Sequence, residues 1–348
     1  MSKIKVGVLG VGTIGKRVAD AVLKQDDMEL VGITARSYNY RAIAAAHKKI
    51  PLFAVEGKDV FEKNGIPIEG DFQNLLDSVD IMVDCAPKKI GKQHKEEHYL
   101  PKKMKAIFQG GEKAKVADSS FVAQCNYDEA VNKDYIRVVS CNTTGLSRTL
   151  REVDKLVGIK EAYATMIRRG ADPWDIRHGP INSVVPVLEL PSHHGPDVQT
   201  VLKNMEIFTT ALSVSSTLMH MHTLTVECEK TPKVDDVVQA FRDTTRVRVV
   251  DNASMVRSTA EIMEYAKDLG RERGDMPEIV VWKEAIGVQH NKLLFMQGVH
   301  QESDVVCENI DAIRAAMGFE DGAKSIEKTN KALDIDIGKY QTRYVPED

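Results

Sequence analysis

One of the five cysteines in this 348-residue chain stands where its thiol could act as a nucleophile. Cys141 follows residues 136–140, an apolar run that predicts a strand, and precedes residues 147–157, whose apolar spacing is compatible with a helix. At a helix N-terminus, free N–H groups and the positive end of the helix dipole stabilise a thiolate, the form that attacks carbonyl carbons. The sequence therefore predicts that Cys141 is a nucleophile.

The other cysteines give no such signal. Cys85 lies in an apolar predicted strand, and Cys228 and Cys307 lie inside regular elements, so we expect these three to be packing residues. Cys125 lies in a polar loop, and its role stays open. There is no C-x-x-C pair, so neither a metal site nor a redox dithiol is predicted, and the sparse cysteines are typical of a reducing cytoplasm.

A glycine-rich motif near the start of the chain predicts a dinucleotide site. Residues 10–15 read G-x-G-x-x-G and lie between a predicted strand, residues 5–9, and a predicted helix, residues 16–24. Glycines allow a tight turn and the close approach of the backbone to a pyrophosphate, and the helix N-terminus provides free N–H groups. The residues expected to contact the dinucleotide are Gly10, Gly12, Thr13, Ile14 and Gly15.

The end of the second predicted strand bears on the choice of dinucleotide. A site that prefers NAD usually has an acidic residue there, which binds the ribose hydroxyls. This strand ends in Thr34, Arg36 and Ser37, with no acidic residue among them. A cation and hydroxyls suit a 2′-phosphate, so we expect NADP to be accepted through Thr34 and Arg36, with NAD left open as a second cofactor.

Two patterns of predicted elements divide the chain. Up to about residue 140, short apolar strands alternate with helices, which predicts a doubly wound parallel sheet of the Rossmann type. Beyond it, longer β-prone runs predict a mainly antiparallel sheet, with helices over residues 198–208, 234–244 and 258–269. A last helix is predicted to begin near Ser303 and Asp304 and to end at Gly318. The predicted fold class is α/β, with a dinucleotide domain over residues 1–139 and an α+β catalytic domain over residues 140–302.

The composition excludes several classes of protein. Hydrophobic residues make up 43% and charged residues 28%, as in ordinary globular proteins, and the formal net charge is −4. General nucleic-acid binders usually carry a basic excess, which this chain lacks. No run of about 18 apolar residues predicts a membrane span, and the N-terminus does not read as a signal peptide. We expect a cytoplasmic protein that binds small molecules, with neither nucleic acid nor a membrane as partner.

Cys141 lies in a motif that reads S-C-N-T-T at residues 140–144. Other distinctive segments are residues 10–15, 109–112, 168–173, 191–195, 218–222 and 301–304. Together, over nearly the whole chain, they resemble phosphorylating glyceraldehyde-3-phosphate dehydrogenases of the archaeal (type II) branch; the bacterial and eukaryotic branch has S-C-T-T-N around its cysteine. The resemblance implies an NAD(P)-dependent homotetramer of glycolysis or gluconeogenesis. It also implies a first domain that includes residues from about 303 to 348.

Such an enzyme needs a base, because a hydroxyl proton must leave as hydride is transferred. A neutral histidine suits this near pH 7, and the candidates in this chain are His193, His194, His220 and His222. The resemblance implies His220. His222 stays open as the alternative, because residues two apart on a strand point to the same side.

The implied substrates, glyceraldehyde 3-phosphate and inorganic phosphate, are anions, so cationic and polar groups should converge on them. Arg168 and Arg169 are adjacent, and on a strand they would point to opposite faces. The resemblance places Arg169 near the cofactor, together with Gly111 and Gln301, which leaves Arg168 as the phosphate candidate. The backbone N–H of Cys141 is a candidate oxyanion donor. The other residues expected by resemblance at the substrate or phosphate are Ser140, Asn142, Thr143, His193, His194 and Gly195.

Two alternative functions are kept open. Aspartate-semialdehyde dehydrogenase and the acyl-phosphate reductase of arginine synthesis also use a cysteine, NADP and phosphate, but neither gives a reason for the segments 191–195 and 218–222. A non-catalytic dinucleotide-sensing protein would leave Cys141 with the reactivity of an ordinary thiol.

Overall fold

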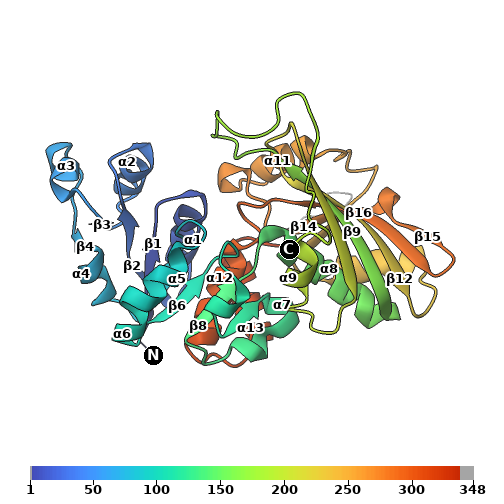
Figure 1. The fold of residues 1–348 in the computed structure, drawn as a ribbon, viewed down its shortest axis with the longest axis horizontal. Coiled ribbons are helices and arrows are strands. Elements are labelled where there is room, and N and C mark those ends of the chain that lie inside the picture. The colour runs from blue at the N-terminus through green and yellow to red at the C-terminus, as the bar shows by residue number, and fades with distance from the viewer. Residues whose placement is uncertain (1, 338–348) are drawn as a thin grey trace, which may run out of the picture. The chain divides into compact units, whose positions relative to one another are not determined.

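A computed structural model describes residues 2–337 of the chain (Figure 1). The chain divides into two compact units, each described by itself below. Unit 1 consists of the residues up to Ser140 together with Val305–Leu333, and unit 2 consists of Cys141–Asp304 together with the described residues after 333. None of the helices in this described part combines the length and the apolar character that crossing a bilayer requires.

Unit 1 contains the predicted doubly wound parallel sheet. Its strands are β1 (Ile4–Leu9), β2 (Met28–Ala35), β3 (Leu52–Ala54), β4 (Gly70–Asp71), β5 (Ile81–Asp84), β6 (Lys105–Phe108), β7 (Ser119–Phe121) and β8 (Tyr135–Val138). Every pairing is parallel, and the order is β4-β3-β2-β1-β5-β6-β8-β7. The order reverses between β1 and β5, where ligands bind in such sheets. The prediction of a Rossmann-type sheet is confirmed.

Helices connect these strands, and the central strands are apolar because a parallel sheet is covered on both faces. In β5, for example, Ile81, Met82 and Val83 are fully buried. The helices of unit 1 are α1 (Thr13–Leu23), α2 (Tyr40–His47), α3 (Lys58–Lys63), α4 (Phe72–Leu76), α5 (Ile90–His94), α6 (Leu100–Lys102), α7 (Ala123–Asn126), α12 (Val306–Ala316) and α13 (Gly322–Ala332).

Unit 2 is built on a mixed sheet in which antiparallel pairs prevail, which confirms the second part of the predicted fold class. Its order is β10-β11-β9-β12-β16-β14-β13, with β15 paired to β16. Only the pairs β9–β11 and β13–β14 of these described strands are parallel. The strands are β9 (Ile159–Arg169), β10 (Val185–Pro186), β11 (Ile207–Val214), β12 (His220–Cys228), β13 (Val247–Val250), β14 (Ile279–Trp282), β15 (Gly287–Gln289) and β16 (Lys292–Val299).

One long helix, α8 (Cys141–Val157), packs on this sheet (Figure 1). Its apolar residues Leu146, Leu150 and Val153 recur at helical spacing and are buried in one core with Leu224 of β12 and Phe295 of β16. This packing fixes the first turn of α8 relative to the strands. The other helices of unit 2 are α9 (His194–Val198), α10 (Val234–Asp243) and α11 (Thr259–Asp268).

Two predicted helices differ from the structure. The helix predicted over residues 198–208 is replaced by the short α9, because the chain from Ile207 pairs with β9 as strand β11. The helix predicted from near residue 303 is α12, which begins at Val306, because the hydroxyl of Ser303 bonds the ring of His300 and does not cap the helix. It is not the last helix, since α13 follows it. Its predicted end is correct, since Gly318 follows with φ of +84°.

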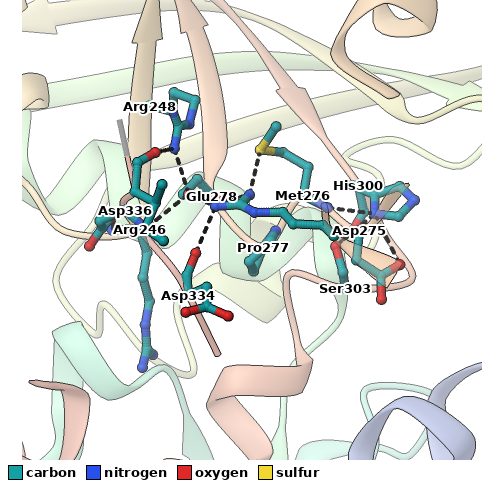
Figure 2. Close-up of polar contacts among 12 residues, drawn as sticks. Arg246, Arg248, Asp275, Met276, Pro277, Glu278, His300, Ser303, Asp334 and Asp336 are labelled. Atoms are coloured by element: carbon teal, nitrogen blue, oxygen red, sulfur yellow. Dashed lines mark hydrogen bonds and ion pairs between the residues drawn. The ribbon is translucent and has the colours of Figure 1, made fainter. Parts of the chain in front are cut away.

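The segment after α13 packs within unit 2, although the predicted first domain included all residues from 303 to 348. Asp336 accepts the backbone N–H of Arg246 at 2.9 Å, and its own N–H donates to Glu278 at 3.0 Å (Figure 2). Arg271 and Arg248 also bind the buried Glu278 carboxylate, and their cations lower its pKa to about 2 against the effect of burial. The remainder of the predicted segment, residues 338–348, lies outside the described residues.

Candidate active site

Cys141 is the first residue of α8, as predicted. The chain just before it is tightly held, since a Cβ on Gly110 would lie 2.2 Å from the backbone nitrogen of Ser140. Gly110 follows the end of β6 and Ser140 the end of β8, two neighbouring strands. Ser140 is therefore packed closely against the loop that follows β6.

The thiol of Cys141 is not the stabilised thiolate that the helix terminus predicts. Burial raises the pKa of this thiol strongly, and the negative charge of Asp304 raises it further. The backbone N–H of Asn142 and the cations Arg169 and Arg168 lower it, but by less. The helix terminus thus acts in the expected direction and is outweighed, so the described state holds a neutral thiol.

Strand register brings the predicted polar residues to one end of the sheet of unit 2. In the antiparallel pair β9–β12, Met221 is opposite Ile167, so the last residues of β9 lie beside the first residues of β12. His220 is opposite Val299 at the end of β16, and Gln301 follows two residues later. Arg168, Arg169 and His220 therefore lie close together, although they are far apart in sequence.

His220 is buried and neutral. The backbone N–H of Arg169 donates to its Nδ1 at 3.0 Å, so the neutral ring carries its proton on Nε2. Burial lowers the pKa of His220 well below its usual range, and the nearby His222 and Arg169 lower it further. The ring nitrogen that a substrate can meet is therefore Nε2, which carries the hydrogen.

Arg169 is fixed by carboxylates. Its guanidinium donates to Glu302 at 2.6 Å and also pairs with Asp172. Glu302 is held in turn by Nε2 of His300 at 3.0 Å, and Nδ1 of His300 accepts the N–H of Met276 at 3.2 Å (Figure 2). The sequence predicted no role for Glu302 or His300. Glu302 lies in the distinctive segment 301–304, which is a signal, whereas no pattern marked His300.

Two predicted ligand residues present polar atoms that the described part of the chain leaves unused. Gln301 is 8% exposed, yet neither its amide oxygen nor its amide nitrogen has a hydrogen-bond partner there. The Nε of Arg168 is likewise buried without a partner among the described residues. Because an unsatisfied buried polar group is costly, such groups suit a ligand. The amide fits a cofactor or substrate, and the guanidinium fits an anion.

The other residues predicted at the phosphate lie around α9 in unit 2. The hydroxyl of Thr143 donates to Asp197 at 2.6 Å, and the N–H of Gly195 donates to the hydroxyl of Thr209 at 2.9 Å. His193 is exposed and stacks on the buried His194, with ring centroids 4.0 Å apart. Of these side chains, that of His193 is the exposed one, whereas His194 and Gly195 are buried.

The glycine-rich loop in unit 1 has the geometry of a phosphate cradle. Gly10 has φ of +97°, and a Cβ on Gly15 would lie 1.8 Å from the carbonyl oxygen of Gly10. Gly12 caps α1 without a side chain, and a Cβ on it would meet nothing within 4 Å. The first turn of α1, with Thr13 and Ile14, is thus open to a ligand, which fits a dinucleotide pyrophosphate.

The residues predicted to choose the dinucleotide separate in the structure. Thr34 is 1% exposed, and its hydroxyl accepts the N–H of Gly10 at 2.9 Å, so this hydroxyl braces the loop. Arg36 lies two residues further on, just after the end of β2, and is exposed, so its cation can reach a phosphate. Gly111, predicted near the cofactor, is exposed in the loop after β6.

Comparisons with known proteins show the family to which this chain is similar. The family model described as "Glyceraldehyde 3-phosphate dehydrogenase, C-terminal domain" matches residues 140–291, and the one described as "Dihydrodipicolinate reductase, N-terminus" matches residues 4–108. A protein of Methanococcoides burtonii is 49% identical over 338 residues, which is 96% of this chain and 100% of that protein. Proteins of Pyrococcus furiosus and Thermococcus kodakarensis are 51% and 50% identical over 335 residues, 96% of this chain and 99% of each. All three are named glyceraldehyde-3-phosphate dehydrogenase.

Proposed function

This chain belongs to the glyceraldehyde-3-phosphate dehydrogenase family, and on that premise we propose that it oxidises glyceraldehyde 3-phosphate with inorganic phosphate and NAD(P)⁺ to 1,3-bisphosphoglycerate. The observation that carries the proposal is the placement of Cys141 at the start of α8, within the fields of Arg168, Arg169 and Asp304. A thiol, two cations and a neutral histidine are the groups that phosphorylating aldehyde oxidation requires.

In the first half of the reaction, Cys141 loses its proton to solvent and its sulfur adds to the aldehyde carbon, which leaves an oxyanion on the substrate. The backbone N–H of Cys141 is the proposed donor to that oxyanion. A bound nicotinamide would supply the electron acceptor for the hydride of that carbon. The product is a thioester on Cys141. A phosphate oxygen then attacks the thioester carbon, and the acyl phosphate and the Cys141 thiolate are released.

His220 is proposed to meet the substrate oxygen as a hydrogen-bond donor, in place of the base expected from the sequence. Because its Nδ1 accepts the N–H of Arg169, the ring meets the substrate oxygen through Nε2–H. In this tautomer Nε2 keeps its hydrogen and donates it as a hydrogen bond to the oxyanion, and the electrons of that oxyanion form the thioester carbonyl as hydride leaves. Arg169, held by Glu302, fixes the ring through its backbone N–H.

The anions are proposed to bind Arg168 and the residues around α9. Arg168 has a buried Nε without a partner among the described residues, and His193 is exposed. His194, Gly195 and Thr143 shape this region through contacts with other residues of unit 2. Ser140 and Asn142 flank the nucleophile and complete the proposed substrate set.

The dinucleotide is proposed to lie on the loop of unit 1, on Gly10, Gly12 and the first turn of α1. Arg36 would meet a 2′-phosphate, which favours NADP, and NAD is proposed as a second cofactor. Gln301, whose amide has no partner in the described chain, is the proposed contact for the nicotinamide amide. Arg169 and Gly111 complete the proposed cofactor set.

We also propose that the protein is a cytoplasmic homotetramer that works in glycolysis or gluconeogenesis. The segment 174–190 of unit 2 supports an assembly, because Ile176, Ile181 and Leu188 are 94%, 93% and 88% exposed. Apolar side chains gathered on one exposed segment mark a surface that another protein covers. Sedimentation of the purified chain measures this, and a monomer at micromolar concentration contradicts it.

The function is tested by following NADP and NAD reduction in parallel, with glyceraldehyde 3-phosphate or aspartate semialdehyde as substrate and with or without phosphate. The proposal predicts phosphate-dependent turnover with glyceraldehyde 3-phosphate. Turnover with aspartate semialdehyde alone would assign the site to the alternative cysteine dehydrogenases. No turnover with either aldehyde, although dinucleotide binds, would favour the non-catalytic alternative.

A further inference from the structure

His222, two residues after His220 on β12, has both ring nitrogens bonded inside the protein. It is 0% exposed. Its Nε2 lies 2.8 Å from Oδ1 of Asn142, and its Nδ1 lies 3.1 Å from Nε2 of Gln297. An amide oxygen only accepts and an amide nitrogen only donates, so Nε2 of His222 carries the hydrogen and Nδ1 does not. His222 is therefore a neutral imidazole of one tautomer.

These two bonds belong to a longer chain with a single direction of donation. On one side, the hydroxyl of Thr149 lies 2.8 Å from Oε1 of Gln297, which turns the Gln297 amide nitrogen toward His222. On the other side, Nδ2 of Asn142 lies 3.4 Å from Nε2 of His194. Nδ1 of His194 lies 3.0 Å from the hydroxyl of Ser192, which in turn donates to Thr209. Each group donates to the next, from β16 across β12 and α8 to β11.

Asn142 is the link in this chain that touches the chemistry. Its backbone N–H bonds the sulfur of Cys141 and lowers the pKa of that thiol. Asn142 is 4% exposed, and its amide oxygen and nitrogen contact His222 and His194 respectively. The side chain thus sets the orientation of the peptide that holds the nucleophile, and it fixes the histidine next to the exposed His193.

We propose that His222 is a positioning residue, which holds Asn142 and through it the Cys141 sulfur and His194, and which takes no part in proton transfer. The inference rests on the proposed function. A protonated His222 would turn an N–H toward the Gln297 amide nitrogen and lose that bond, so proton uptake at this ring is opposed by its partners. Burial acts in the same direction and lowers the pKa of His222 to about 3.

The test compares His222→Gln, whose amide nitrogen can stand where Nε2 donates, with His222→Leu, which can donate nothing. Val226→Ala, at a fully buried position further along β12, is the matched control for lost stability. The readouts are kcat, KM, the acid limb of the pH–rate profile and the temperature of unfolding. We expect His222→Gln to keep kcat within about threefold, and His222→Leu to lower it about 30-fold, since small misplacements of reacting groups have such effects. The acid limb should stay where it is in both variants.

Three outcomes overturn the proposal. Equal loss in both His222 variants together with a vanished acid limb would make His222 the base. Wild-type rates in both would give it no role. A loss in Val226→Ala equal to that in His222→Leu, at equal loss of stability, would make the effect one of folding alone.

Alkylation of Cys141 by iodoacetamide, without substrate or cofactor, separates this inference from the proposed function. His222→Leu should slow alkylation at pH 8 about fivefold, because the N–H that stabilises the thiolate is no longer held in place. In His222→Gln the alkylation rate should stay within about twofold of the wild-type rate, because the amide nitrogen can keep the hydrogen bond to Asn142. Unchanged or faster labelling in His222→Leu contradicts the positioning role even if the wild-type chain oxidises no aldehyde.

Discussion

The glycine-rich loop of unit 1 and the cysteine site of unit 2 are built in opposite ways. The loop is contiguous, residues 10–15, and presents backbone: Gly12 leaves open space, and Gly15 lets the helix approach the carbonyl of Gly10. The cysteine site is assembled from side chains of α8, the end of β9, the start of β12 and residues 301–304. Its parts are joined by strand register and hydrogen bonds.

This difference decides what a substitution does. In the loop, the damage should follow the added volume at one position. In the cysteine site, removal of a group should affect a partner on another strand, since each group is held by the next. The predictions below use this contrast and run from the largest expected effect to the smallest.

Cys141→Ser should have the largest effect, because no neighbouring group can replace the sulfur. A serine hydroxyl is a far weaker nucleophile, and we expect kcat to fall by about 10³-fold or more. Cys125→Ser is the control and should keep wild-type turnover. Turnover in Cys141→Ser above one tenth of the wild type (roughly the loss expected from a positioning group) would remove Cys141 from the chemistry.

The alkylation rate of Cys141 should depend steeply on pH. Its thiol pKa is raised, so the thiol is protonated at pH 7, and the reactive thiolate fraction grows as the pH rises toward the pKa. Below the pKa that fraction increases about tenfold per pH unit, so labelling at pH 9 should be about 100-fold faster than at pH 7. Mass spectrometry of the labelled peptide measures it. A rate that levels off between pH 7 and pH 8 would show a thiolate already formed and would contradict the burial effect.

Glu302→Gln should lower activity through the residues that Glu302 holds in place. The change removes the carboxylate that binds both Arg169 and His300, and Arg169 fixes His220 through its backbone N–H. We expect kcat/KM to fall about 30-fold, as for misplaced reacting groups. Glu206→Gln, at an exposed carboxylate of the same unit, should change nothing. Equal rates in the two variants would mean that the contacts of Glu302 with Arg169 and His300 do not position the site.

Gly12→Ala and Gly15→Ala should show that an added methyl group in the loop weakens cofactor binding or stability, depending on what it meets. In Gly12→Ala the new Cβ meets no protein atom, so stability should stay while the KM for NAD(P)⁺ rises about tenfold, because the backbone can no longer approach the pyrophosphate. In Gly15→Ala the Cβ would meet the carbonyl oxygen of Gly10 at 1.8 Å, so stability should also fall, by about 2 kcal/mol. Thermal unfolding and cofactor titration separate the two. A stable Gly12→Ala variant with wild-type KM would contradict the claim that the backbone of this loop binds the pyrophosphate.

The same contrast explains how far the sequence alone could predict the molecule. The parallel sheet, the loop and the place of Cys141 depend on residues next to each other in the chain, and these predictions are confirmed by the structure. His300 and Gln297 act through contacts across strands, and nothing in their local sequence marks them. The thiolate expected at Cys141 failed for a related reason, since the helix start is local whereas burial and Asp304 come from the folded unit. The individual roles of Arg168, Gln301 and His193 stay predictions.

The central claim, a thioester on Cys141 that phosphate releases, is tested most directly by one stopped-flow measurement of NAD(P)H formation from glyceraldehyde 3-phosphate with and without phosphate. Without phosphate, we predict a burst of about one NAD(P)H per Cys141, the mark of an accumulating acyl-enzyme, followed by slow hydrolysis. With phosphate, the burst should pass into steady turnover. Steady turnover at the same rate in the absence of phosphate, or no burst at all in the wild-type chain, would contradict the account.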